Sequence, residues 1–100
     1  MTFKEKVYQE CQKIPLGKVS TYKDIAISLG DPKLARAVGN ALHVNPDVKK
    51  TPCHRVVSSS GRLASNYGLG PNKQQQLLEK EGVVVIDDHV DLKRYRYEKS

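Results

Sequence analysis

Helix-start signals recur in the first third of the chain and constrain the fold more than any other feature. Residues 2–5, TFKE, form a capping box, in which the threonine hydroxyl and the glutamate carboxylate each accept a free backbone N–H. Residues 21–24, TYKD, repeat this pattern, and Asp31-Pro32 combines a cap with a first-turn proline. Apolar residues at helical spacing follow each signal, so the sequence predicts three short helices, the first ending near Lys13.

The short connection between the second and third helices predicts a helix-turn-helix, because Gly30 ends one helix and Asp31 begins the next. The third helix has an apolar stripe of Ala35, Val38 and Leu42. Its opposite face is basic and rich in hydrogen-bonding groups, and it comprises Lys33, Arg36, Ala37, Asn40 and His43. Such a face is usually ordinary solvated surface. Its position after the turn favours a recognition helix instead.

The second half of the chain predicts a small β component. Val56 and Val57 indicate a short buried strand, residues 58–70 are loop-like, and Pro71 and Gly82 bracket a fourth helix. Residues 83–92 then predict a hairpin, followed by a basic aromatic tail. We therefore expect one domain over residues 1–100, mainly α with a small β component, of the winged-helix-like helix-turn-helix class.

The excess of basic residues indicates what kind of molecule the protein could bind. Seventeen Lys and Arg against eleven Asp and Glu give a formal charge of +6 and a pI of about 9.4. This excess suggests a polyanionic partner such as nucleic acid, although a lysine-rich solvated surface fits equally well on charge alone. No apolar run has the length of a membrane span, and the first residues lack a secretory signal. We expect an intracellular monomer, in the cytoplasm or a nucleus, without membrane contact.

The chain has two cysteines, each of which could form a disulfide, bind a metal, pack in the core or act as a nucleophile. A disulfide between Cys11 and Cys53 is rare in a reducing compartment, and no metal-ligand spacing accompanies either residue, so we expect neither a metal nor a cofactor. Helical spacing assigns Cys11 to the core. Cys53 is followed by His54, a base that could generate a thiolate, and Glu81 is a candidate to orient that histidine. By spacing alone, a structural cysteine beside a surface histidine remains the favoured interpretation.

Several motifs, taken in order, favour a catalytic Cys53 over a structural one. They are GKVSTYKDIA at 17–26, ARAVGNAL at 35–42, Asn45-Pro46, PCHRVV at 52–57, NYG at 66–68 and LLEKEGV at 77–83. With them the sequence resembles the O6-alkylguanine-DNA alkyltransferases over nearly its whole length, and in particular their C-terminal active-site domain. The resemblance implies direct-reversal DNA repair. The alkyl group of O6-alkylguanine in double-stranded DNA would pass irreversibly to a cysteine, once per protein molecule.

The resemblance also implies roles for individual residues. Cys53 is similar to the nucleophile, His54 to the base that activates it through water, and Glu81 to the carboxylate that polarises the histidine. Asn45 resembles a hinge asparagine that ties the recognition helix to the active-site turn.

Further positions match the substrate and DNA contacts of the family. Tyr22 resembles the tyrosine that touches the flipped base and a phosphate, and Arg36 resembles the arginine that fills the vacated place in the duplex. The implied substrate-binding set is Tyr22, Leu42, Val56, Ser65, Tyr67 and Gly68, with the Val56 carbonyl facing the guanine amine. The implied DNA-binding set is Tyr22, Lys33, Ala35, Arg36, Ala37 and Asn40.

Three departures from the family pattern stand out. We expect the chain to lack the N-terminal domain common in the family, Gln74 stands where lysine is frequent, and the loop reads SNYGLG where a serine and paired glycines are common. Two other functions stay open. Alkyltransferase-like proteins bind the same lesions and recruit excision repair, but carry tryptophan or alanine at the position of Cys53. A winged-helix regulator with an inert thiol would bind one operator sequence, yet the chain offers no dimerisation segment for it.

Overall fold

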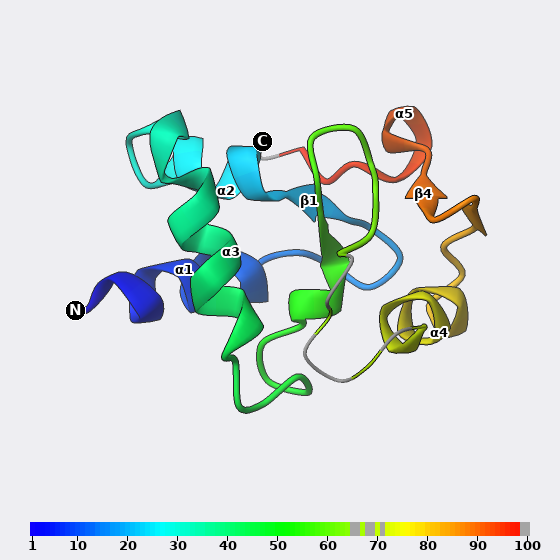
Figure 1. Ribbon diagram of the computed structural model, residues 1–100, viewed down its shortest axis with the longest axis horizontal. Coiled ribbons are helices and arrows are strands. Elements are labelled where there is room, and N and C mark those ends of the chain that lie inside the picture. The colour runs from blue at the N-terminus through cyan, green and yellow to red at the C-terminus, as the bar shows by residue number, and fades with distance from the viewer. Residues whose placement is uncertain (65–66, 68–69, 71, 99–100) are drawn as a thin grey trace.

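The N-terminal half is a helix-turn-helix unit (Figure 1). The computed structural model describes residues 1–64, 67, 70 and 72–98. Helices α1 (Phe3–Gln12), α2 (Tyr22–Ser28) and α3 (Ala35–His43) pack together around one apolar core. Both bonds of the predicted capping box are present at α1, where the Glu5 amide donates to Thr2 Oγ1 and the Thr2 amide donates to Glu5 Oε1. The three predicted helices are therefore confirmed.

The third helix begins differently from the prediction. Residues Pro32–Leu34 form a 3₁₀ turn, η1, and the α-helix starts only at Ala35. Asp31 caps the turn as expected, because its Oδ1 accepts from the Lys33 amide at 2.9 Å. A tighter 3₁₀ turn is a common way to begin a helix.

A short parallel sheet joins the two halves of the molecule. Strand β1 (Ser20–Thr21) pairs with β2 (Val56–Val57), Ser20 opposite Val56 and Thr21 opposite Val57. Successive side chains of a strand face opposite ways. Val56 accordingly packs in the core of α1–α3, and Val57 packs in a second core with Val19, Leu78 and Tyr95. The segment that follows Cys53 therefore lies between the two cores and contributes a valine to each.

The second core lies under α4 (Lys73–Lys80), a hairpin and α5 (Leu92–Tyr95). In the hairpin, β3 (Val85–Ile86) runs antiparallel to β4 (His89–Val90), as predicted. Asp87 and Asp88 make its turn with positive φ angles of 51° and 61°, the conformation that a two-residue hairpin turn requires. Helix α5 was not predicted, and the basic tail enters the fold through it, because Tyr95 is buried.

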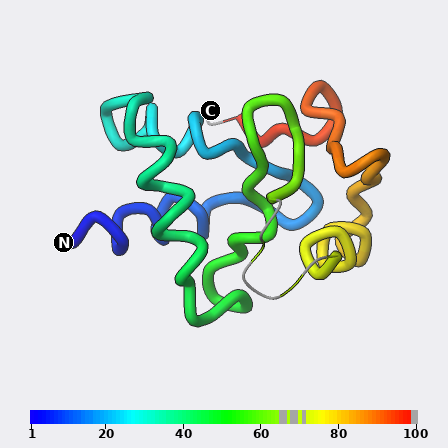
Figure 2. The backbone as a smooth tube through the Cα atoms, viewed as in Figure 1, coloured from blue at the N-terminus to red at the C-terminus, as the bar shows by residue number. Residues whose placement is uncertain are grey.

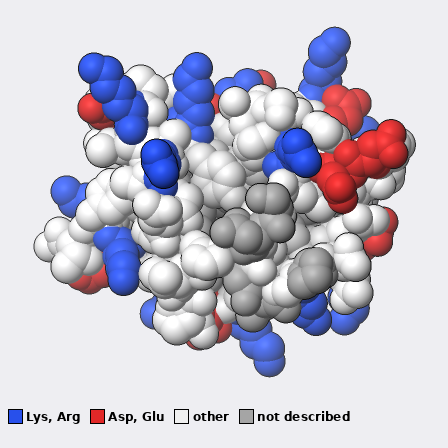
Figure 3. Space-filling view, viewed as in Figure 1, with Lys and Arg blue, Asp and Glu red and all other residues white. Residues whose placement is uncertain are grey.

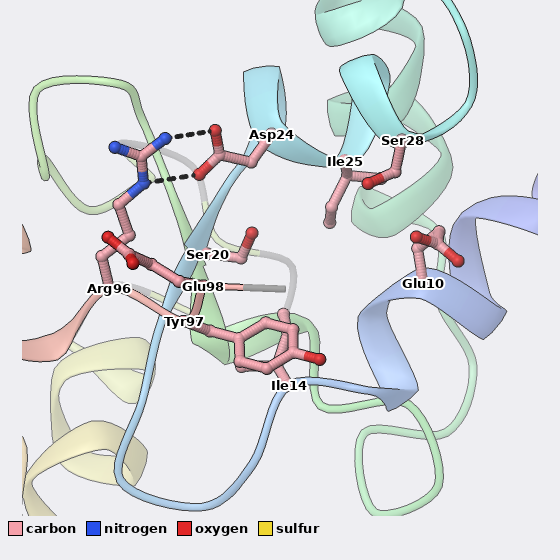
Figure 4. Close-up of a pocket in the computed structure, with 9 residues that line it drawn as sticks. All are labelled: Glu10, Ile14, Ser20, Asp24, Ile25, Ser28, Arg96, Tyr97 and Glu98. Atoms are coloured by element: carbon pink, nitrogen blue, oxygen red, sulfur yellow. Dashed lines mark hydrogen bonds and ion pairs between the residues drawn. The ribbon is translucent and has the colours of Figure 1, made fainter. Parts of the chain in front are cut away.

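The C-terminal segment, residues 95–98, returns to the helix-turn-helix unit (Figure 2). The Val19 amide donates to the Tyr95 carbonyl at 2.8 Å, and the Tyr97 amide donates to the Val19 carbonyl at 2.7 Å. Arg96 then forms a bidentate ion pair with Asp24 of α2, beside a cleft of about 380 Å³ (Figure 4). In the described ranges, no helix is long and apolar enough to cross a membrane.

Candidate active site

Cys53 begins a 3₁₀ turn, η2 (Cys53–Arg55), that leads directly into β2. Pro52 precedes it with φ −76°, and the Cys53 amide donates to the Thr51 carbonyl at 2.7 Å. Cys53 is 8% exposed and packs in the core of α1–α3. Its Sγ lies 3.4 Å from the Tyr67 hydroxyl. This turn therefore holds a largely covered thiol against a phenol.

His54 is buried next to the thiol in sequence, and its two nitrogens differ. Nε2 lies 2.9 Å from Glu81 Oε2, whereas Nδ1 is buried without a hydrogen-bond partner among the described residues. Burial lowers the pKa of His54, against the opposing effect of the Glu81 carboxylate. The imidazole is therefore neutral near pH 7. A neutral ring that donates from Nε2 to a carboxylate carries its lone pair on Nδ1.

Glu81 is held from two sides at the C-cap of α4. Besides His54, it receives both arms of the Arg55 guanidinium, Nε to Oε1 and Nη2 to Oε2, each at 2.8 Å. Burial acts to raise the pKa of Glu81, but the hydrogen bonds from Arg55 and His54 outweigh it and hold the pKa below its ordinary value. Arg55 also donates from Nη1 to the Ile14 carbonyl at 2.8 Å. An ionised Glu81 thus fixes the tautomer of His54.

Asn45 lies just beyond α3 and connects that helix to the cysteine turn. Its Nδ2 donates to the Thr51 carbonyl at 2.8 Å, the same carbonyl that accepts from the Cys53 amide. Thr51 is itself buried, and its hydroxyl accepts from Gln12 Nε2 at 2.9 Å. The geometry fits the hinge position that the resemblance implies.

The predicted substrate residues surround Cys53 in part. Tyr22, at the start of α2, is half-buried against the core, and Leu42 of α3 is buried in it. Burial raises the pKa of the Tyr22 hydroxyl, and burial together with the bond to Cys53 raises that of Tyr67. Both phenols therefore remain protonated and able to donate. Ser65 and Gly68 lie outside the described residues.

Val56 and Gln74 meet in the interior. The Val56 carbonyl, expected to face a guanine amine, accepts from Gln74 Nε2 at 3.0 Å. A carbonyl oxygen has two lone pairs, so this bond leaves acceptor capacity. Gln74 is 2% exposed, which makes the departure from lysine at this position a buried feature of the site.

The turn η1 and helix α3 present most of the predicted DNA-binding residues on their outer side. Lys33, Arg36 and Asn40 are exposed, and Ala37 is partly exposed between them. Ala35 packs partly against the core, as its place in the apolar stripe predicts. Gly39 approaches Tyr22, since a Cβ built there would lie 3.7 Å from the tyrosine ring. A methyl group there would make ordinary van der Waals contact with the ring, so Tyr22 of α2 lies directly beside α3.

Charge is unevenly spread over the face shown in Figure 3. Lys and Arg side chains stand over most parts of this face, including the side formed by α2 and α3. Acidic side chains gather on the right, where the hairpin turn of Asp87 and Asp88 is exposed. A polyanion is favoured over the helix-turn-helix side and disfavoured near the hairpin.

Cys11 is a core residue and is not part of the candidate active site. It is fully buried in α1, and burial raises the pKa of its thiol to about 12. The prediction of a packing thiol is confirmed. Within the described part of the chain, no group of three His, Cys, Asp or Glu side chains is arranged to hold a metal ion.

Sequence reasoning missed the contributions of Arg55 and Thr51. Arg55 stands within the PCHR motif, but nothing in its spacing shows that its side chain crosses to Glu81, 26 residues later. Thr51 left no signal, because a threonine before a proline is typical of a turn. The bond between Tyr67 and Cys53 was also unpredicted.

Comparison with known proteins identifies the family. The family described as "6-O-methylguanine DNA methyltransferase, DNA binding domain" matches residues 2–83. The chain belongs to this family. A methylated-DNA–protein-cysteine methyltransferase of Saccharolobus islandicus is 47% identical over 83 residues, which are 83% of this chain and 52% of the relative. The chain thus spans about half the length of such curated relatives.

Solved structures of two kinds of family member resemble the domain. Atl1 of S. pombe, in complex with damaged DNA containing O6-carboxymethylguanine, has a TM-score of 0.87 at 36% identity and is matched over 97% of this chain and 95% of its own. The Mycobacterium tuberculosis OGT in complex with DNA has a TM-score of 0.76 at 41% identity, over 82% of this chain and 49% of its own. The expected fold class, a mainly helical domain with helix-turn-helix character, is confirmed.

Proposed function

We propose that this domain repairs DNA by transferring the alkyl group of O6-alkylguanine to Cys53, irreversibly and once per molecule. The observation that carries the proposal is the chain of contacts from Arg55 through Glu81 to His54, next to a thiol held in a turn. A purely structural cysteine has no need of a neutral histidine whose free nitrogen is buried.

The proposed activation uses His54 Nδ1 as the general base. The ionised Glu81 keeps the proton on Nε2, so Nδ1 is the nitrogen that can take the Cys53 proton, through a bridging water. The imidazolium that forms is stabilised by the adjacent carboxylate. Tyr67, which stays protonated, donates to the sulfur as negative charge develops on it.

The transfer itself is a displacement at the alkyl carbon. The sulfur forms a bond to this carbon, the bond from the carbon to guanine O6 breaks, and its electron pair stays on the guanine. The proton that left Cys53 neutralises the guanine ring, so the products are a thioether and unmodified guanine. A hydrogen-bond donor to the leaving base lowers the barrier, and we assign this role to the protonated Tyr22.

DNA binding is assigned to the outer side of η1 and α3. Lys33 contacts phosphates, Ala37 permits close approach to the minor groove, and Arg36 fills the place vacated by an extruded base. A damaged base costs less to unstack than a sound one, which contributes selectivity. We propose that residues 1–100 suffice for these steps, as a monomer and without metal or cofactor.

A second candidate is lesion binding without transfer. It is favoured by the match to Atl1, which covers nearly all of both chains. Cys53 and the His54–Glu81 contact favour transfer instead, because a protein that only binds the lesion does not need an activated thiol.

Intact mass spectrometry separates these functions. The protein is incubated with a duplex containing one O6-methylguanine, and the adduct is located by peptide mapping. We expect one methyl group per molecule on Cys53, with Cys11 unmodified. Tight binding without a mass change would establish the second candidate, and methylation of Cys11 or repeated turnover would refute the proposed mechanism.

A further inference from the structure

The buried amide of Gln74 makes hydrogen bonds with three separate backbone groups. Its Nε2 donates to the carbonyls of His54 at 3.2 Å and Val56 at 3.0 Å, and its Oε1 accepts from the Ala64 amide at 2.8 Å. The side chain extends inward from the first turn of α4 and is 2% exposed. Every donor and acceptor of the amide except one lone pair is therefore used.

These contacts require an amide and no other side chain of similar length. A lysine supplies donors for the two carbonyls but no acceptor for Ala64, and a glutamate supplies the acceptor but no donors. A buried N–H without a partner is costly. With lysine at this position, the Ala64 backbone would be released from α4.

Ala64 leads toward the phenol that contacts the nucleophile. Tyr67 follows three residues later, and its hydroxyl lies 3.4 Å from Cys53 Sγ. Ala64, Tyr67 and Gln74 also line a cavity of about 250 Å³, whose other lining residues include Arg62, Leu63 and Asn72. Ala64 and Tyr67 form a wall that therefore borders open space, and Gln74 ties the Ala64 end of that wall to the cysteine turn.

We propose that Gln74 is a specificity-determining residue that limits the size of the alkyl group transferred to Cys53. It does so by fixing the distance between the wall, which Ala64 and Tyr67 form, and the turn that carries the thiol. This inference rests on the proposed function, since it concerns the same reaction. Without the Ala64 bond, the wall moves into the cavity and the site accepts longer groups.

The test compares transfer rates for two lesions in four variants. Gln74→Met removes all three bonds at similar volume, and Gln74→Lys removes only the acceptor for Ala64. Gln76→Met and Gln76→Lys are the matched controls, because Gln76 is exposed on the same helix. Single-turnover rates are measured on duplexes with O6-methylguanine and with O6-butylguanine.

In both Gln74 variants we expect the ratio of the butyl rate to the methyl rate to rise by roughly tenfold or more, the scale of discrimination that apolar pockets provide. The Gln76 variants should keep the parent ratio. An unchanged ratio in Gln74→Met would overturn the inference. An unchanged ratio in Gln74→Lys alone would overturn the assignment to Ala64.

Two further measurements keep this result separate from the proposed function. If the parent transfers no group from either duplex, the proposed function fails, and the reaction of Cys53 with iodoacetamide and with its bulkier N-butyl derivative then reports the same ratio. Amide hydrogen exchange in the parent needs no variant. Slow exchange at Ala64 is expected, and an unprotected Ala64 amide in the folded protein would contradict the anchor.

Discussion

The Arg55–Glu81 ion pair permits a quantitative test of the candidate site. Arg55→Met removes both guanidinium bonds to Glu81 and the bond to the Ile14 carbonyl, while keeping an aliphatic stem. Removing one partner of a buried pair costs about 3–5 kcal/mol. The two side chains are 15% and 14% exposed, so we expect the lower end, about 3 kcal/mol. For a domain of this size, that loss lowers Tm by roughly 12–24 °C.

The chain provides its own control. Arg96 makes a bidentate pair with Asp24 at 2.9 and 2.7 Å, but the two side chains are 48% and 22% exposed. Arg96→Met should therefore cost about 1 kcal/mol or less, and the loss should shrink further in high salt. Urea unfolding of both variants measures the difference. Equal losses would refute the conclusion that burial makes the Arg55 pair the stronger one.

The pH dependence gives a second check. The folded-state pKa of Glu81 lies below its ordinary value of 4.5, so its contribution to stability is present above that pH and is lost as the pH falls through the folded-state pKa. The difference between parent and Arg55→Met should therefore shrink below about pH 4.5. The folded-state pKa of His54 is also lowered, so the parent should begin to lose stability below pH 6.5. A difference that stays constant into strong acid would contradict the assignment to Glu81.

Three predictions concern the reaction. Cys53→Ala should abolish the mass adduct while a lesion duplex still binds in fluorescence anisotropy; loss of binding would place the thiol in recognition. His54→Ala should slow transfer by about 10²–10⁴ near neutral pH and recover partly in alkali, and a parent-like rate would exclude His54 as the base. Arg36→Ala should slow repair of the duplex more than reaction with the free modified base, and equal losses would exclude a role in filling the duplex.

The helices were predictable because their signals are local. The threonines at positions 2 and 21 each accept the expected backbone amide, and Asp87-Asp88 marks the hairpin turn. The sheet between β1 and β2 was not predictable, because two residues per strand carry too little pattern to indicate a partner far along the chain. Helix α5 was missed for a related reason, since only long-range packing of Tyr95 shows that this basic segment is folded.

In the candidate site, too, local features were predictable from the sequence and long-range contacts were not. The adjacency of Cys53 and His54 is visible in the sequence, and Glu81 was already a candidate to orient the histidine. The bidentate contact of Arg55 and the three bonds of Gln74 depend on how α4 docks against the cysteine turn. The sequence could mark Gln74 only as a departure, whereas the structure shows which backbone groups it satisfies.

The position of β1 has a consequence for the order of folding during synthesis. One edge of this strand pairs with β2, and at Val19 the other edge exchanges hydrogen bonds with Tyr95 and Tyr97. A nascent chain that has emerged only as far as β2 can already close the turn at Cys53, but Val19 still exposes an unpaired N–H and C=O. An open strand edge is a template for pairing with another chain. Residues 95–97, which leave the ribosome well after β2, are therefore those that remove this risk.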